Sequence, residues 1–141
     1  MTTDHDDDEA DVRFDFHHDP RAAADARRKL DEILADPEDP IADDVRLATS
    51  ELVSNAVQHT ADGGQVRAWD PRPDVPLRVE VEDRDPAMPV IPAEPPPIGG
   101  RGLTIVDAVA DAWGVEEQPP GKVVWAEFDR DRRTAATEEP D

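Results

Sequence analysis

Residues 50–59 read SELVSNAVQH and form the second half of the pattern that decides the fold. Asp39 and Pro40 precede this pattern as an N-cap residue and a proline of the first turn. The apolar positions then recur at helical spacing: Val45, Ala48, Leu52, Val53, Ala56 and Val57. This spacing predicts a helix from about residue 40 to His59, with one apolar face for a core.

Three polar residues follow one another along this helix at intervals of four. Glu51, Asn55 and His59 therefore lie on one side of the helix, next to the apolar stripe rather than opposite it. A side-chain carbonyl is a good oxygen ligand for magnesium, and a carboxylate one turn earlier could accept a proton from a hydroxyl group. Alternatively, Glu51 and Asn55 are ordinary surface residues on a solvated helix edge. The spacing alone leaves both interpretations open.

The segments on either side of this helix predict a sheet and two more helices. Alternating apolar residues indicate strands with one buried face, and aspartate followed by proline indicates a helix start. In chain order, we expect a strand over Val12–Phe16, a helix over about Pro20–Ala35, the helix of residues 40–59, strands over Gln65–Trp69 and Leu77–Glu82, a proline-rich loop over Arg84–Gly100, a helix from Leu103 to Trp113 ended by Gly114 in the C′ position, and a strand over Lys122–Phe128. This order predicts an α+β fold, a two-layer α/β sandwich whose mixed, mostly antiparallel sheet is covered on one face by helices.

Composition limits the classes of function. The 141 residues suffice for one domain, which we expect over residues 12–130, between an acidic disordered tail (1–11) and a polar C-terminal tail (131–141). The net charge of -20 disfavours direct binding to nucleic acid or to an anionic membrane. The absence of cysteine excludes disulfides, thiolate metal sites and a cysteine nucleophile. With neither a long apolar run nor a basic leader, the sequence predicts a cytoplasmic protein.

Asp83 follows the predicted strand Leu77–Glu82. Because side chains alternate between the two faces of a strand, Asp83 lies on the same face as Leu77, Val79 and Val81, which is the face turned toward the helices. A carboxylate buried there needs a partner, because an unpaired buried charge is costly. The exocyclic amine of adenine would be a suitable donor. Alternatively, the strand ends at Glu82 and Asp83 caps the following turn.

A glycine-rich stretch, Gly99 to Leu103, comes immediately before the third predicted helix. Glycines allow backbone N–H groups to approach phosphate oxygens closely, and a helix N-terminus favours an anion. The same residues could simply form a flexible end to the proline-rich loop.

Together, these elements resemble the GHKL group of ATP-binding proteins, whose nucleotide-binding domain has the Bergerat fold. The closest resemblance is to the anti-sigma-factor serine kinases of actinobacteria. Residues 51–55 (ELVSN) look like the N box of that family, 83–87 (DRDPA) like its G1 box and 100–103 (GRGL) like its G2 box. The order of the boxes matches, and the last predicted strand, 121–128 (GKVVWAEF), also resembles that of actinobacterial members.

The resemblance implies a role for each matching residue. Asn55 is expected to ligate Mg²⁺, Glu51 to act as the general base, and Asp83 to accept the adenine amino group. The other cofactor-binding residues are expected to lie in the phosphate lid, where Arg101 would reach the phosphates: Gly100, Arg101, Gly102 and Leu103. One departure is that Asp85 and Ala87 stand where the G1 box usually has glycines, so the turn beside adenine must be made differently.

The resemblance implies a serine/threonine protein kinase that uses ATP and Mg²⁺. Its substrate would be an anti-anti-sigma partner, and it would also regulate a sigma factor by direct binding, as a homodimer that presents the binding surface. The irregular G1 box favours an alternative, a non-catalytic ATP-binding module that switches a protein–protein interaction.

Overall fold

The computed structural model describes residues 10–59, 63–84 and 102–133. The elements that these residues form are, in chain order, β1 (Val12–Phe16), α1 (Ala22–Leu30), α2 (Ala42–His59), β2 (Gly64–Trp69), β3 (Leu77–Asp83), α3 (Gly102–Val109), β4 (Ala112–Gln118) and β5 (Gly121–Phe128). The predicted loop over Arg84–Gly100 lies outside the described residues, except for Arg84.

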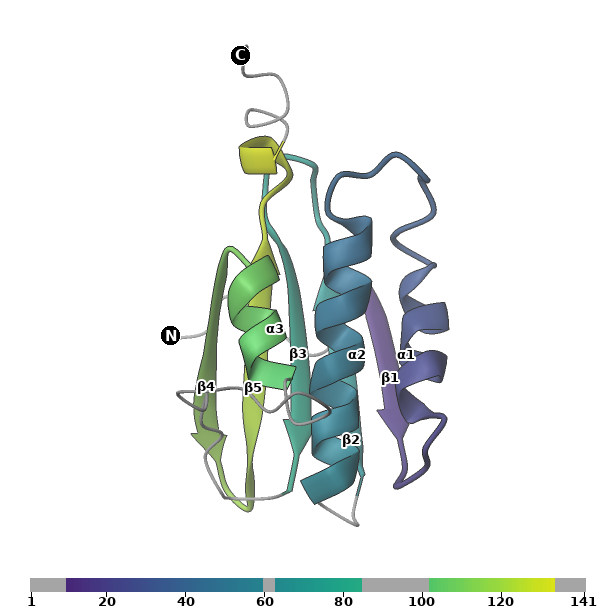
Figure 1. Cartoon of the computed structure of the whole chain (residues 1–141), viewed down its shortest axis with the longest axis vertical. Helices are drawn as coiled ribbons and strands as arrows, with labels where there is room; N and C mark the ends of the chain where they lie inside the picture. The colour runs from purple at the N-terminus through teal and green to yellow at the C-terminus, as the bar shows by residue number, and fades with distance from the viewer. Residues whose placement is uncertain (1–9, 60–62, 85–101, 134–141) are drawn as a thin grey trace.

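The strands form a five-stranded sheet in the order β1-β2-β3-β5-β4, and each neighbouring pair is antiparallel. Helices α1, α2 and α3 lie on the same side of this sheet (Figure 1). The predicted fold class, a two-layer α+β sandwich with helices on one face, is therefore confirmed. β3 occupies the centre of the sheet, and its C-terminal end lies near the C-terminal half of α2 and the start of α3 (Figure 1).

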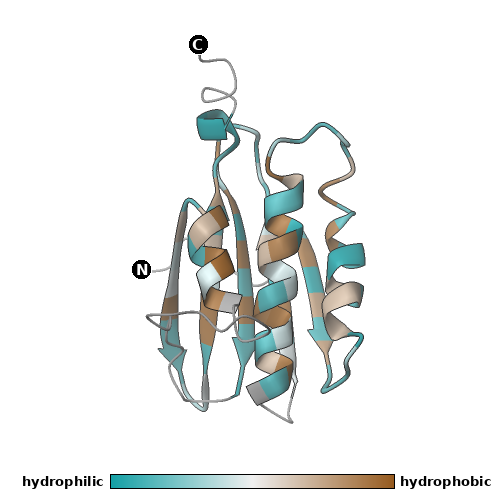
Figure 2. Cartoon of the chain, in the orientation of Figure 1, coloured by the Kyte–Doolittle hydropathy of each residue, from teal (hydrophilic) through white to brown (hydrophobic). Residues whose placement is uncertain are grey.

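The hydrophobic core lies between the helices and the sheet. Leu77, Val79 and Val81 of β3 face it and are buried, whereas the residues between them are only partly buried. The hydropathy colouring in Figure 2 shows the same mixture of apolar and polar residues on strands and helices. On α2, five residues of the predicted apolar stripe are buried: Val45, Ala48, Leu52, Val53 and Ala56. The periodicities of 2 and 3.6 in the sequence thus produce the two layers.

The first helix is shorter than the sequence predicts. It ends at Leu30 rather than near Ala35, and the chain continues in turns in which the N–H groups of Ile33 and Leu34 donate to the Leu30 carbonyl. Leu34 nevertheless reaches the core. The apolar spacing alone therefore could not locate the end of the helix.

The predicted end of the third helix is wrong. The helix ends at Val109, and the following residues form β4, a strand that the sequence reading missed. Gly114 does not cap a helix but pairs with Trp125 of β5. A Cβ on Gly114 would lie 2.8–2.9 Å from the Trp125 indole ring, so the glycine makes room for tryptophan. Trp113 packs against the core, and its indole N–H donates to Asp107 at 2.9 Å.

The sheet face turned away from the helices carries an ion-pair network. Arg67 pairs with Glu80 and Glu82, and Arg78 pairs with Glu80 and Glu127. The Arg78 guanidinium also lies 4.5 Å from the centroid of the Trp125 ring. Charged and aromatic side chains thus pack against one another on this face, and the sheet itself lies between them and the apolar core.

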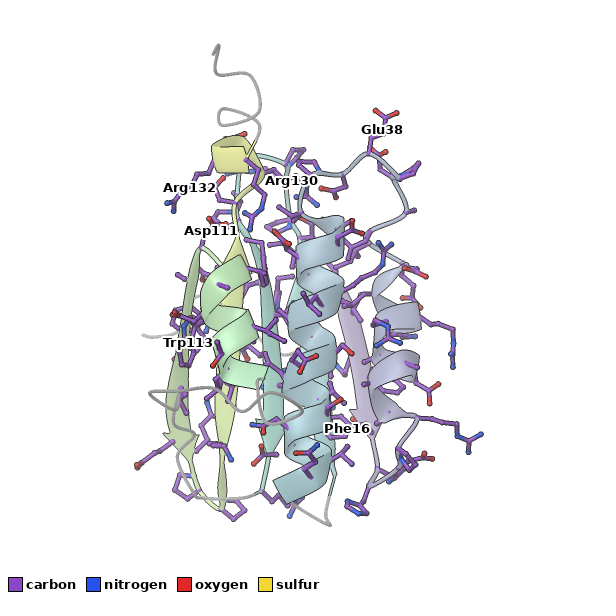
Figure 3. The ribbon with its side chains drawn as sticks, viewed as in Figure 1. Phe16, Glu38, Asp111, Trp113, Arg130 and Arg132 are labelled. Carbon is purple, nitrogen blue, oxygen red and sulfur yellow. The ribbon has the colours of Figure 1, made fainter. Side chains whose placement is uncertain are left out.

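Arg130 joins three segments at the end of the molecule where α2 begins (Figure 3). It follows β5 and donates to both carboxylate oxygens of Asp39, just before α2, and to both of Asp70, just after β2, each at 2.9 Å. Hydrogen bonds to Asp70 and Asp39 raise the pKa of Arg130 above its ordinary value. The guanidinium therefore clamps the end of the chain to two loops that are distant in sequence.

We expect Arg130→Met to lower the free energy of unfolding by about 2 to 3 kcal/mol, because it leaves two largely buried carboxylates without their cation. Urea denaturation followed by circular dichroism measures the change. In the control, Lys29→Met removes the half-exposed pair of Lys29 with Glu32 and should cost about 0.5 kcal/mol or less. Equal unfolding midpoints for Arg130→Met and the wild type would show that the clamp does not stabilise the fold.

Gly121 fixes how closely β3 and β5 approach at one end of the sheet. A Cβ there would lie 1.9 Å from the carbonyl oxygen of Asp83 and 2.5 Å from the Cα of Arg84. Both neighbours are backbone atoms, so the strands themselves would have to move apart. We expect Gly121→Ala to lower the free energy of unfolding by about 1 to 3 kcal/mol. Chemical denaturation tests this, and an unchanged midpoint would contradict the close approach.

Candidate functional site

The predicted site residues lie on three elements that come together at one end of the core. α2 packs against α3, β3 and β5. Figure 1 shows that the C-terminal half of α2, the end of β3 and the start of α3 lie at the same end of the domain. The clamp of Arg130 is at the opposite end (Figure 3), so the fold separates the stabilising contacts of that residue from the candidate site.

Glu51 and Asn55 lie on α2 at the edge of the buried stripe. Both are partly buried, next to the fully packed Leu52 and Ala56. Among the described residues, no side-chain hydrogen bond to either of them is found. Their carboxylate and amide groups are one helical turn apart, on the same side of the helix.

Ser50, one residue before Glu51, ties α2 to α1. Its hydroxyl accepts a hydrogen bond of 2.5 Å from the Arg27 guanidinium. This contact joins the two helices at the height of Glu51, so the backbone that carries the carboxylate is anchored to its neighbour. The sequence reading did not single out Arg27, because the contact depends on how α1 packs on α2.

Asp83 is the last residue of β3, and only 5% of it is exposed. Its location on the face of Val81, toward the helices, agrees with the parity of the strand. The structure adds a partner that the sequence reading missed. The Lys122 ammonium lies 3.1 Å from the Asp83 carboxylate, and each side chain is 5% exposed.

Lys122 reaches Asp83 because β3 and β5 are neighbours. The two residues are direct cross-strand partners in the antiparallel register. Lys122 is two residues before the buried Val124, so the alternation along the last strand places both side chains on the same face of the sheet. However, the partnership of two strands 39 residues apart was not evident from the sequence, and β4, which comes between them in the chain, was itself missed.

The predicted phosphate lid is only partly within the described residues. Gly102 begins α3 and Leu103 packs into the core with 6% exposure. Gly100 and Arg101 lie outside the described residues. The first N–H groups of α3 have no partner within the helix, which makes this end suitable for an anion.

A hollow of about 370 Å³ opens beside the end of β3. It is lined by charged residues of both signs together with the ends of β1 and β2: Asp15, Phe16, His17, Gly64, Gln65, Arg67, Glu82, Asp83 and Arg84. Glu51 and Asn55 do not line it, so it does not join the three predicted elements into one pocket.

The described residues contain no group of three or more His, Asp or Glu side chains placed to hold a metal ion. His17 and His18, which the sequence places at the end of β1, are both exposed. In the same residues, no helix is both long enough and apolar enough to cross a membrane.

Comparison with known proteins agrees with the fold. A solved structure of the RsbU and RsbW domains of Rv1364c from Mycobacterium tuberculosis matches with a TM-score of 0.63 and 23% sequence identity. The match covers 84% of this chain but only 32% of that longer chain. No curated protein matches by sequence. The model of the histidine kinase-like ATPase domain matches residues 16–128. This chain therefore belongs to the family of histidine kinase-like ATPase domains.

Proposed function

We propose that this domain binds Mg-ATP where α2, β3 and α3 meet, and that it phosphorylates a serine or threonine of an anti-anti-sigma protein. Direct binding to a sigma factor would be its second activity. The observation that supports the proposal is that α2, which carries the partly buried Glu51 and Asn55, packs against β3, which ends in the buried Asp83. Membership of an ATPase-domain family supports the choice of ATP.

Each residue has a chemical task that suits its type. Asp83 would accept a hydrogen bond from the adenine amino group. Asn55 would hold Mg²⁺ through its side-chain oxygen, and phosphate oxygens and water would complete the coordination, as is usual for this ion. Gly100, Arg101 and Gly102 would enclose the phosphates at the start of α3, and Leu103 would anchor that turn in the core. The bound ion would supply neutralisation of phosphate charge.

Glu51 would act as the general base. It lies one helical turn before Asn55, so a hydroxyl placed for attack on the γ-phosphate could give its proton to the Glu51 carboxylate. Phosphoryl transfer depends mainly on positioning and on charge stabilisation. The contact between Arg27 and Ser50 would support this positioning by fixing the backbone of α2 next to the base.

The partners are proposed from the resemblance of the three boxes to anti-sigma-factor kinases. The matched structure contains an RsbW domain, which is consistent with that choice, although at 23% identity the match extends to the fold alone. The proposal includes action in the cytoplasm, protein partners rather than direct nucleic-acid or membrane binding, and a homodimer that presents the partner surface.

A non-catalytic ATP-binding switch is the second candidate. The specific observation in its favour is that Asp85 and Ala87 replace the usual glycines of the G1 box. In this case, nucleotide would order the lid and change a protein–protein contact without phosphoryl transfer. Mg-ATP-dependent partner capture by a wild-type protein that transfers no phosphate would favour the switch over the kinase.

We expect saturating Mg-ATP to raise the melting temperature of the wild type and Asn55→Ala to abolish most of this rise. Ligand at a hundred times its Kd stabilises a protein by about 2.7 kcal/mol, which is easily measured by thermal unfolding. Gln58→Ala changes an exposed residue on the same helix and should retain the full rise. If Mg-ATP left the melting temperature of folded wild type unchanged, the proposed site would be wrong.

Glu51→Gln should reduce phosphoryl transfer about 10²- to 10⁴-fold while leaving Mg-ATP binding nearly unchanged, because it removes the base and keeps the shape of the side chain. The assay incubates labelled ATP with the domain and its anti-anti-sigma partner and measures label on the partner. Glu32→Gln alters an exposed glutamate away from the site and serves as the matched control. Undiminished transfer by Glu51→Gln would remove the catalytic assignment.

A further inference from the structure

The Asp83–Lys122 pair is a feature of the site that the three sequence motifs do not contain. The Lys122 ammonium lies 3.1 Å from the Asp83 carboxylate on the helix-facing side of the neighbouring strands β3 and β5. Gly121, directly before Lys122, allows the backbones of the two strands to approach closely at this point. The position of the ammonium beside the carboxylate is therefore set by the register of the sheet and not by a mobile loop.

This ion pair is unusual for its surroundings. Among the described residues, Asp83 and Lys122 are the only charged side chains buried on the helix-facing side of the sheet. The other buried charged residue, Arg67, lies on the opposite face, where it pairs with glutamates. Removing two charges from water is costly, and an apolar pair of similar volume is often as stable. Packing alone therefore does not account for a charge pair at the ligand-binding end of the core.

We propose that Lys122 reads the purine ring together with Asp83 and so determines the specificity of the site for adenine. The inference rests on the proposed ATP binding and adds a residue to it. Asp83 accepts a hydrogen bond from the exocyclic amine, and the Lys122 ammonium donates one to the neighbouring ring nitrogen N1. An ammonium has three donors, so a bond to the base is compatible with its bond to Asp83.

The order of acceptor and donor explains why this pair would select adenine. Adenine presents a donor, its amine, next to an acceptor, N1. Guanine presents the reverse order, an acceptor oxygen next to an N–H donor. In the same pose, the guanine oxygen would face the Asp83 carboxylate and the guanine N–H would face the Lys122 ammonium. A site built to hydrogen-bond one pattern rejects the other strongly, because polar groups then remain unpaired or opposed.

The test combines a change in the ligand with a change in the protein. Binding of ATP and of 1-deaza-ATP, in which a C–H group replaces N1, is measured by calorimetry with magnesium for the wild type and for Lys122→Met. We expect the wild type to bind 1-deaza-ATP at least about tenfold more weakly than ATP, and Lys122→Met to bind the two within about twofold of each other. The preference for ATP over GTP should also fall at least tenfold in Lys122→Met.

Arg78→Met is the matched control. It removes a cation from an ion pair on the same two strands but on the face turned away from the helices, so the wild-type ratio of ATP to 1-deaza-ATP affinity should remain. If Lys122→Met does not fold, the comparison of ATP with 1-deaza-ATP in the wild type still tests the role of Lys122. Equal binding of ATP and 1-deaza-ATP by the wild type would overturn the role of Lys122, as would an unchanged ratio in a folded Lys122→Met.

The two proposals fail in different ways. If the wild type binds no ATP at all, the proposed function itself is wrong, and the role of Lys122 falls with it. The other case is that the wild type binds ATP, Asn55→Ala does not, and the wild type binds ATP and 1-deaza-ATP equally well. The proposed function then stands, and the role of Lys122 alone is refuted.

Discussion

The antiparallel register of β3 against β5 is the constraint on which the candidate site depends. It makes Asp83 the direct partner of Lys122 and continues the alternation that buries Leu77, Val79 and Val81. Gly121 permits the close backbone approach at this point. A shift by one residue would turn every side chain of β3 to the opposite face. The same register therefore places the apolar side chains of β3 in the core and a charged pair at the end of the core.

The two ends of the domain differ in how their polar groups are used. At the end where α2 begins, Arg130 donates to Asp39 and Asp70, and Arg133 contacts Asp44 and Asp111. At the other end, Glu51 and Asn55 have no side-chain hydrogen bonds within the described part of the chain. The polar contacts of Arg130 therefore stabilise the fold at the end opposite to the site that we propose where α2, β3 and α3 meet.

The sequence predicted the elements whose pattern is strong and local. The apolar stripe of α2 and the strict alternation of β3 each span several periods, and both were located to within a few residues. β4 was missed because its sequence, AWGVEEQ, alternates weakly and follows the apolar α3 after only Ala110 and Asp111, with no proline or glycine between them. Gly114 was mistaken for a helix cap, since a glycine that makes room for a tryptophan on the next strand looks the same in the sequence.

The sequence by itself determined the two-layer architecture and the helix that presents Glu51 and Asn55, because both follow from periodicities of 3.6 and 2 along the chain. For Asp83 it left open a helix-facing position at the strand end and a cap of the following turn, and the structure shows that β3 extends to Asp83. Only the tertiary structure decided that Lys122 is the partner of Asp83, that Arg27 anchors α2 beside Glu51, and that Arg130 joins three distant segments. These contacts depend on which strands and helices become neighbours, and that choice is made by the packing of the whole core.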